Sequence, residues 1–175
     1  LNGDLHRTYR LVRKVRKDMI VVEATRARTE TPMTKTTMDR EEITQRNLGQ
    51  DVPYLLKWTP SVTVTSDAGT GIGYTGMRVR GSDLTRINVT LNGIPLNDAE
   101  SQAVFWVDLP DLLSSVDDIQ IQRGVGTSTQ GAGAFGATID LNTGLHQSEP
   151  YGWISGSVGS FNTNKATVAF GSGMI

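Results

Sequence analysis

Helix-like and strand-like spacings of apolar residues alternate along the chain, and the first helical signal covers residues 39–48. Asp39 can cap the first turn, Glu42 completes a capping box three residues later, and Met38 can pack against Ile43. Gly49 can adopt the left-handed conformation that closes a helix. The pattern therefore predicts a short helix that begins after Asp39 and ends just before Gly49.

A second helical turn is predicted to begin at Asp51. Its apolar residues Leu55, Leu56 and Trp58 are expected to be buried against the rest of the protein. The helix must end before Pro60, because the residue ahead of a proline is disfavoured in helical conformation.

From residue 62 onward the hydrophobic period changes to two, which is typical of half-buried strands. Strands are predicted at residues 62–65, 77–80, 87–91, 116–123 and 137–141. Asn92-Gly93 favours a tight turn, and residues 109–114 allow one more short helix. The expected fold class is α+β: a small mixed β-sheet with short helices and long loops.

The two ends of the chain differ from this central part. Residues 1–17 are basic and residues 29–37 lack apolar periodicity, so the latter are expected to be extended or mobile. Residues 153–158 and 165–170 read as two strands; Val168 and Phe170 share one face of the second. Such alternation fits a membrane-barrel strand and equally any half-buried sheet strand. The first residue is not methionine, which indicates a processed or recombinant piece.

Composition excludes several classes of function. The 175 residues carry a net charge of −1, which argues against a general nucleic-acid binder. There is no cysteine, and His6 and His146 are far apart, so neither a disulfide framework nor a thiolate or histidine metal site is expected. No run of apolar residues is long enough for a spanning helix. We therefore expect no metal and no cofactor.

Two glycine motifs resemble a dinucleotide fingerprint without its context. Residues 71–76 and 131–136 both read G-x-G-x-x-G, but each leads into a strand-like stretch instead of the helix that would face a pyrophosphate. The carboxylate pairs, such as Asp108 and Asp111, have no candidate base or nucleophile at a useful spacing. We expect no catalytic residue and no enzymatic activity.

Several segments, taken together, resemble the plug domain of TonB-dependent outer-membrane transporters. Val79-Arg80-Gly81, a hydrophobic strand, and Asn92-Gly93-Ile94-Pro95-Leu96-Asn97-Asp98 follow the family's order. Ile119 to Gly124, the glycine-rich residues 131–136 and the strand from Ala137 to Leu141 continue it. Asn92 stands in place of the more usual aspartate. The sequence of these segments most resembles that of transporters of the Bacteroidetes type.

This resemblance implies three domains and a set of functional residues. Residues 1–38 would be an N-terminal extension with a TonB box, residues 39–150 the plug, and residues 151–175 the first strands of a truncated outer-membrane β-barrel. The TonB box would comprise Asp18, Met19, Ile20, Val21, Val22, Glu23 and Ala24. Arg80 and Arg123 would anchor the plug to barrel carboxylates. The residues expected to contact substrate from apical loops are Tyr74, Asn97, Asp98, Phe105 and Trp106.

The implied function is gating and substrate contact in a receptor that imports a scarce nutrient, such as a ferric chelate, cobalamin or a glycan. The implied partners are the TonB C-terminal domain, the receptor's own barrel and a small-molecule or oligosaccharide substrate. The plug would sit inside an outer-membrane barrel with a periplasmic N-terminus, and this piece would be soluble. A plug needs a hydrogen-bonding outer surface, so many polar strand residues are expected to face a water-lined wall: Thr63, Thr65, Asn88, Thr90, Gln120 and Gln122.

Two other interpretations stay open at this point. A stand-alone soluble β-rich recognition or adhesion domain would use Tyr74, Phe105 and Trp106 as its binding patch. An enzyme on a nucleotide-binding fold would need a helix directly after Gly76 or Gly136. Each of the three aromatic residues fits the core as well as it fits a binding surface.

Overall fold

The computed structural model describes residues 33–126, 134–143, 149–160 and 162–173. The candidate TonB box, Asp18–Ala24, lies outside these described residues. Within the described part of the chain, no helix is long and apolar enough to cross a membrane.

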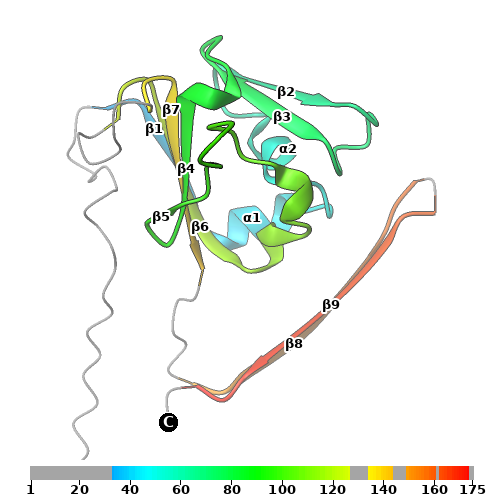
Figure 1. Ribbon diagram of the computed structural model, residues 1–175. Coiled ribbons are helices and arrows are strands. Elements are labelled where there is room, and N and C mark those ends of the chain that lie inside the picture. Colours follow the sequence, from blue (N-terminus) through cyan, green and yellow to red (C-terminus); the bar gives the residue numbers. More distant parts are fainter. Residues whose placement is uncertain (1–32, 127–133, 144–148, 161, 174–175) are drawn as a thin grey trace, which may run out of the picture.

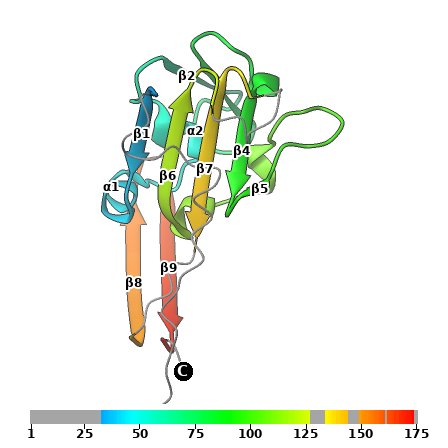
Figure 2. The same cartoon turned by 90° about the vertical axis from the view of Figure 1, so that its left-hand side faces the viewer.

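A five-stranded sheet with the order β1-β6-β7-β4-β5 forms the centre of the fold (Figures 1 and 2). Its strands are β1 (Lys35–Met38), β4 (Ile87–Leu91), β5 (Ile94–Pro95), β6 (Val116–Arg123) and β7 (Ala137–Thr143). β4 and β7 are parallel, whereas the β1–β6, β6–β7 and β4–β5 pairs are antiparallel. The mixed sheet and the tight turn at Asn92-Gly93 are as predicted, and the sheet also takes in residues 35–38.

One face of this sheet carries the hydrophobic core. Ile119, Ile121, Ile139 and Leu141 are almost fully buried on it. Figure 1 shows the helices α1 (Arg40–Arg46) and α2 (Val52–Leu56) on the same side of the sheet. Every second side chain of β7 enters this core, and β6 alternates in the same way from Ile119 onward, after a register shift between Val116 and Asp118.

The predicted first helix has the predicted cap. The Asp39 carboxylate accepts a hydrogen bond from the Glu42 backbone N–H at 2.9 Å, and Ile43 is completely buried. The helix ends at Arg46, whose side chain forms an ion pair with Glu42 at 2.8 Å. Glu42 thus pairs along the helix surface with Arg46.

The prediction that Trp58 is buried was wrong. α2 ends at Leu56, and Leu55 and Leu56 enter the core as expected. Trp58 lies beyond the helix, where the chain no longer follows the helical face, and its side chain is 76% exposed. The Lys57 ammonium lies 5.2 Å from the centre of its ring, a cation–π contact at the surface.

The polar face of the sheet also differs from expectation. Thr90, Gln120 and Gln122 are buried within the chain, although they were expected to face a water-lined wall. Hydrogen bonds between these side chains offset the cost of burying them: the Thr90 hydroxyl donates to Asp140 at 2.5 Å, and the Gln122 amide donates to Gln120 at 3.0 Å. The threonines of β2 are exposed, in line with the prediction.

A separate two-stranded sheet consists of β2 (Val62–Ser66) and β3 (Thr75–Val79), joined by a loop over residues 67–74. Arg80, expected at the end of a strand, follows β3 in a left-handed turn with φ of 52°. The described part of the body also contains the short 3₁₀ helices η2 (Leu84–Arg86), η3 (Trp106–Asp108) and η4 (Leu112–Ser114).

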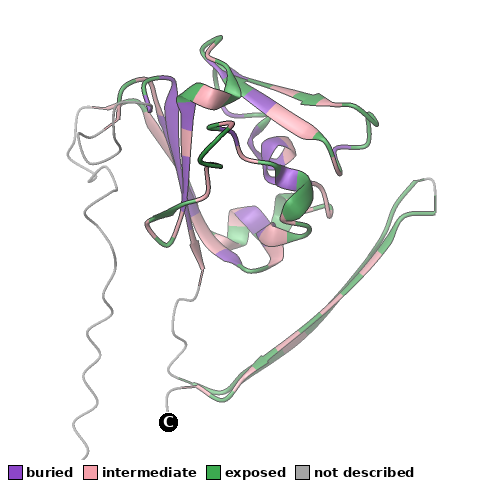
Figure 3. Ribbon diagram, in the orientation of Figure 1, coloured by how far each residue is buried: buried purple, intermediate pink, exposed green. Residues whose placement is uncertain are grey.

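The last described segment is an antiparallel hairpin of β8 (Tyr151–Val158) and β9 (Asn164–Gly171), close to the predicted positions. Figure 3 shows exposed residues along most of its length. Ile154, paired with Val168, is 81% exposed, and Phe170 is 84% exposed. On the other face, Lys165 forms an ion pair with Asp111 and donates a hydrogen bond to the Ser114 hydroxyl at 2.8 Å.

Candidate functional site

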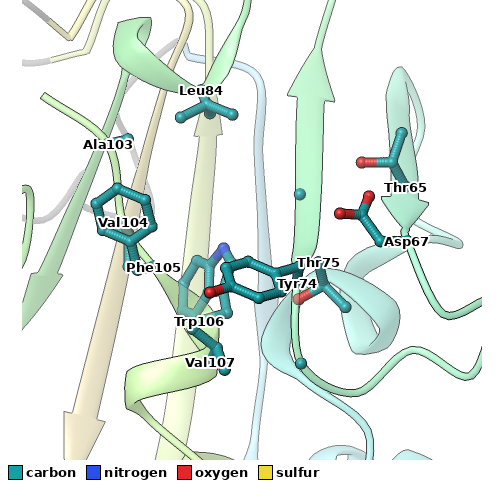
Figure 4. Close-up of a pocket in the computed structure, with 12 residues that line it drawn as sticks. Thr65, Asp67, Tyr74, Thr75, Leu84, Ala103, Val104, Phe105, Trp106 and Val107 are labelled. Atoms are coloured by element: carbon teal, nitrogen blue, oxygen red, sulfur yellow. The ribbon is translucent and has the colours of Figure 1, made fainter. Parts of the chain in front are cut away.

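A surface pocket of about 220 Å³ brings together two segments that the sequence singled out as loops. One wall comes from the β2–β3 hairpin and includes Asp67 and Tyr74. The other comes from residues 103–107, where Phe105 and Trp106 lie. Figure 4 shows side chains from both segments lining this space, with Leu84 at its edge.

The three aromatic residues expected to contact substrate all line this pocket, but they differ in exposure. Tyr74 is 68% exposed and Phe105 is 47% exposed, so both offer ring surface to a ligand. Trp106 is only 5% exposed and belongs to the hydrophobic core. The Trp106 ring therefore packs beneath the pocket. Tyr74 and Phe105 are surface residues, whereas Trp106 is a core residue.

Asn97 does not line the pocket, and its side chain is fully engaged with the backbone. Its carbonyl oxygen accepts the Val89 N–H at 2.8 Å, and its NH₂ group donates to the Ile87 and Gln102 carbonyl oxygens, each at 2.9 Å. The amide thus continues the hydrogen-bond ladder along the edge of β4, where β5 pairs only with its last two residues.

Asp98 also holds the loop in shape. Its carboxylate accepts the backbone N–H groups of Ser101 at 2.7 Å and Glu100 at 3.1 Å. These bonds favour the charged form, so the Ser101 N–H above all lowers the pKa of Asp98 below its ordinary value. Substrate contact by Asn97 and Asp98 stays a prediction, and both residues have a structural task in this loop.

Arg80 and Arg123 lie close together although they are distant in sequence. The Arg123 guanidinium donates to the Pro60 carbonyl at 3.1 Å, and the Arg80 backbone N–H donates to the Ser61 carbonyl at 2.9 Å. A Cβ placed on Gly124 would lie 2.8 Å from Nη1 of Arg80, so the Arg80 side chain extends over Gly124.

Neither of these arginines forms an ion pair with a residue in the described ranges. Nε of Arg123 is buried without a hydrogen bond. A buried guanidinium nitrogen without an acceptor is energetically costly.

Asp83, next to this turn, has a local role. Its carboxylate accepts hydrogen bonds from the Thr85 hydroxyl at 2.7 Å and the Thr85 backbone N–H at 2.8 Å. These bonds lower the pKa of Asp83. Asp83 thus caps η2 and fixes the turn that carries Arg80.

No group of histidine, aspartate and glutamate side chains in the described ranges could hold a metal ion. The first glycine motif, at residues 71–76, leads into strand β3 and not into a helix. Asp67 is one of the pocket residues that sequence reasoning did not single out; it lies within a predicted loop but in no recognisable motif.

A mixed sheet packed against two short helices, with long loops that meet at an aromatic pocket, defines a plug-like α+β domain. The TonB-dependent Receptor Plug Domain family matches residues 27–138. The chain belongs to this family.

Solved structures show the same fold. The ferripyoverdine receptor of the outer membrane of Pseudomonas aeruginosa matches with a TM-score of 0.64 and 20% identity over 83% of this chain and 18% of its own. The ferric yersiniabactin uptake receptor of Yersinia pestis matches with a TM-score of 0.62 and 16% identity, covering 80% of this chain and 21% of its own.

The alcaligin outer membrane receptor of Bordetella pertussis matches with a TM-score of 0.59 and 21% identity, over 79% of this chain and 23% of its own. The chain thus spans about a fifth of the length of these receptors. A comparison with curated proteins gave no match.

Proposed function

We propose that this chain is the gating and substrate-contacting plug of an outer-membrane receptor that imports a scarce nutrient with energy supplied through TonB. The observation that carries the proposal is the family match over residues 27–138. The similar solved structures include uptake receptors for iron-chelating molecules, which supports nutrient import as the purpose of the whole protein. In this proposal the plug lies inside a barrel in the outer membrane, with its N-terminus in the periplasm.

The barrel would supply the missing acceptors for Arg80 and Arg123. Arg80 and Arg123 lie close together and form no ion pair within the described residues. If a surrounding barrel excludes water, their guanidinium groups need carboxylate partners. Bidentate arginine–carboxylate pairs are both strong and directional. We propose that these two arginines fix the plug in the barrel lumen.

Residues 151–175 would begin that barrel, after a plug at residues 39–150 and an extension at residues 1–38. The β8–β9 hairpin supports this division, because Ile154, Val168 and Phe170 share an exposed apolar face while Lys165 contacts the plug from the other face. A barrel strand has the same two environments, lipid outside and polar contacts inside.

The N-terminal segment Asp18–Ala24 would recruit the TonB C-terminal domain. A short extended segment with β-branched residues can add a strand to the edge of a partner's sheet, and backbone hydrogen bonds then supply the affinity. Force transmitted through this contact would displace or remodel the plug and open a path for the substrate.

The test is capture of the chain by an immobilised TonB C-terminal domain. We expect the unmodified chain to bind and the double variant Ile20→Pro, Val22→Pro to lose binding, since proline removes backbone donors from the added strand. The matched control is Val12→Pro, which places a proline outside the proposed box. Equal capture of the double variant and the unmodified chain would refute this TonB box.

A further inference from the structure

The pocket between the β2–β3 hairpin and residues 103–107 has an unusual charge for a site expected to receive metal chelates. Among the described residues that line it, Asp67 alone has a formal charge at neutral pH, and none of them is a lysine, arginine or histidine. An anionic ligand in this pocket would meet a carboxylate and no compensating cation, which is electrostatically unfavourable.

The Asp67 carboxylate is also available to a ligand. The backbone N–H of Asp67 bonds to the Tyr74 carbonyl at 3.1 Å, but the side chain makes no hydrogen bond with any described residue and is exposed. The Thr65 and Tyr74 hydroxyls, also in the lining, are equally unengaged within the described ranges. By contrast, the Thr75 hydroxyl already donates to Asp51 at 2.7 Å.

These groups lie beside flat apolar surface. Tyr74 is mostly exposed and Phe105 is about half exposed, and Figure 4 shows both rings in the pocket lining. Trp106 is buried behind them and Leu84 is partly exposed at the edge. A ligand must therefore offer one apolar face to the rings and hydrogen-bonding groups to Thr65, Asp67 and Tyr74.

We propose that this pocket binds an uncharged, polyhydroxylated ring, such as one pyranose unit of a neutral oligosaccharide. The C–H face of the ring stacks on Tyr74 and Phe105, and its hydroxyl groups donate to Asp67 and exchange hydrogen bonds with Thr65. A charge-assisted hydrogen bond to the carboxylate is stronger than a neutral one. An organic cation would satisfy Asp67 and the aromatic rings, but without a ring of hydroxyl groups it offers Thr65 and Tyr74 fewer hydrogen-bonding groups than a pyranose does.

This inference rests on the proposed function, because it assumes that the pocket meets the imported substrate. The test uses the 175-residue chain and backbone amide NMR. Maltohexaose, cellohexaose and xylohexaose serve as neutral probes, ferric citrate as the anionic chelate and choline as the cation. We expect at least one oligosaccharide to give saturable shifts at the amides of Asp67 and Tyr74, and neither charged probe to do so.

Two variants locate the binding. Tyr74→Ala should abolish the shifts, and Asp67→Asn should weaken binding roughly tenfold, the loss expected when a charge-assisted hydrogen bond becomes neutral. Both residues are exposed, so the fold should survive; unchanged far-UV circular dichroism checks this. The matched control Glu100→Gln removes an exposed carboxylate outside the pocket and should bind as the unmodified chain does.

Saturable binding of ferric citrate or choline at Asp67, or no shift with any of the three oligosaccharides, would overturn the proposed ligand class. TonB capture, measured on the same preparation, separates the two proposals. If TonB binds and no sugar does, only the ligand class is refuted; if sugar binds and TonB does not, only the TonB-coupled role is.

Discussion

At the scale of single residues, Gly136 shows how closely the backbone packs where the loops meet the sheet. Its N–H donates to the Arg86 carbonyl and its own carbonyl accepts the Gly124 N–H, at 2.9 and 2.8 Å. A Cβ at this position would lie 2.6 Å from Cβ of Ser82 and 2.8 Å from the Arg86 carbonyl oxygen. The backbone cannot yield to this contact without losing a hydrogen bond.

We therefore predict that Gly136→Ala lowers the free energy of unfolding by about 1–3 kcal/mol, the usual cost of overpacking. Urea unfolding followed by circular dichroism measures it. Gly152→Ala is the control, since its added Cβ would meet only the Ala169 carbonyl oxygen at 3.9 Å. Equal stability of the two variants would contradict the packing described here.

Asp98 leads to a prediction about pH. Its pKa is lowered in the folded chain, so the carboxylate stabilises the loop when it is charged and loses that effect as the pH falls below its ordinary value of 3.8. The stability difference between the unmodified chain and Asp98→Ala should be present at pH 6 and shrink as the pH falls through the folded-state pKa. Urea unfolding across this pH range tests it, with Glu100→Ala as control. A stability difference between the two proteins that grew as the pH fell would contradict this prediction.

Residue environments were only partly predictable from the sequence. Alternation correctly separates Ile119 and Ile121 from Gln120 and Gln122, because it reports which side chains share a face. It does not report what each face meets, so the buried hydrogen bonds of the two glutamines were not foreseen. Trp58 was misplaced for a similar reason, since two residues beyond a short helix the helical spacing no longer applies.

At the scale of elements, Lys165 makes the ion pair between the β8–β9 hairpin and the body. Lys165 reaches Asp111 and Ser114 from β9, and Ser114 itself donates to the Asp111 carboxylate at 2.8 Å. Nearby, the Arg40 guanidinium lies 5.9 Å from the centre of the Trp153 ring. The face of the hairpin that carries Lys165 and Trp153 thus contacts the body through the cations of Lys165 and Arg40, and the apolar face lies on the opposite side of the hairpin.

We predict that Lys165→Met detaches the hairpin and leaves the body folded. Trp153 fluorescence should shift to longer wavelength, and the free energy of unfolding of the body should change by less than about 1 kcal/mol, as for other solvent-accessible ion pairs. The control Lys35→Met removes the same charge from β1, which pairs with β6, and should leave Trp153 emission in place. Unchanged Trp153 emission in Lys165→Met would show that other contacts hold the hairpin.

Most strands could be located from the sequence, and their order could not. Period-two alternation identified β4, β6 and β7 because each places its apolar side chains on one face and its polar side chains on the other. β1 lies in a stretch with little apolar periodicity, and its pairing becomes visible only opposite β6, where Lys35 faces Gln122. The pocket could not be predicted for the same reason. Both of its loops were expected from the sequence, but their contact depends on how the β2–β3 hairpin packs on the rest of the chain.

At the scale of the whole molecule, the exposed apolar face of the hairpin is an association surface. Ile154, Val158, Val168 and Phe170 are all well exposed, and the outer edges of β8 and β9 have no neighbouring strand among the described residues. Open edges beside apolar side chains favour pairing with another chain.

We predict that the isolated chain self-associates in buffer as its concentration rises, and that the double variant Ile154→Thr, Val168→Thr reduces this association. Sedimentation velocity over a concentration series measures it. The control Ser155→Thr changes the opposite face and should associate as the unmodified chain does. A variant as associated as the unmodified chain would place the interface elsewhere.

The strand order also has a consequence for biosynthesis. β1 pairs with β6, and β4 pairs in parallel with β7, so both pairings join segments that are far apart in the sequence. The hydrogen bonds between β4 and β7, where Ile87 is paired with Ala137, can form only after residue 137 has been synthesised. Pairings between such distant segments form slowly, whereas a local hairpin such as β2–β3 forms early. A nascent chain that ends before residue 137 lacks β7, so one edge of β4 has no partner strand and is open to pairing with other chains.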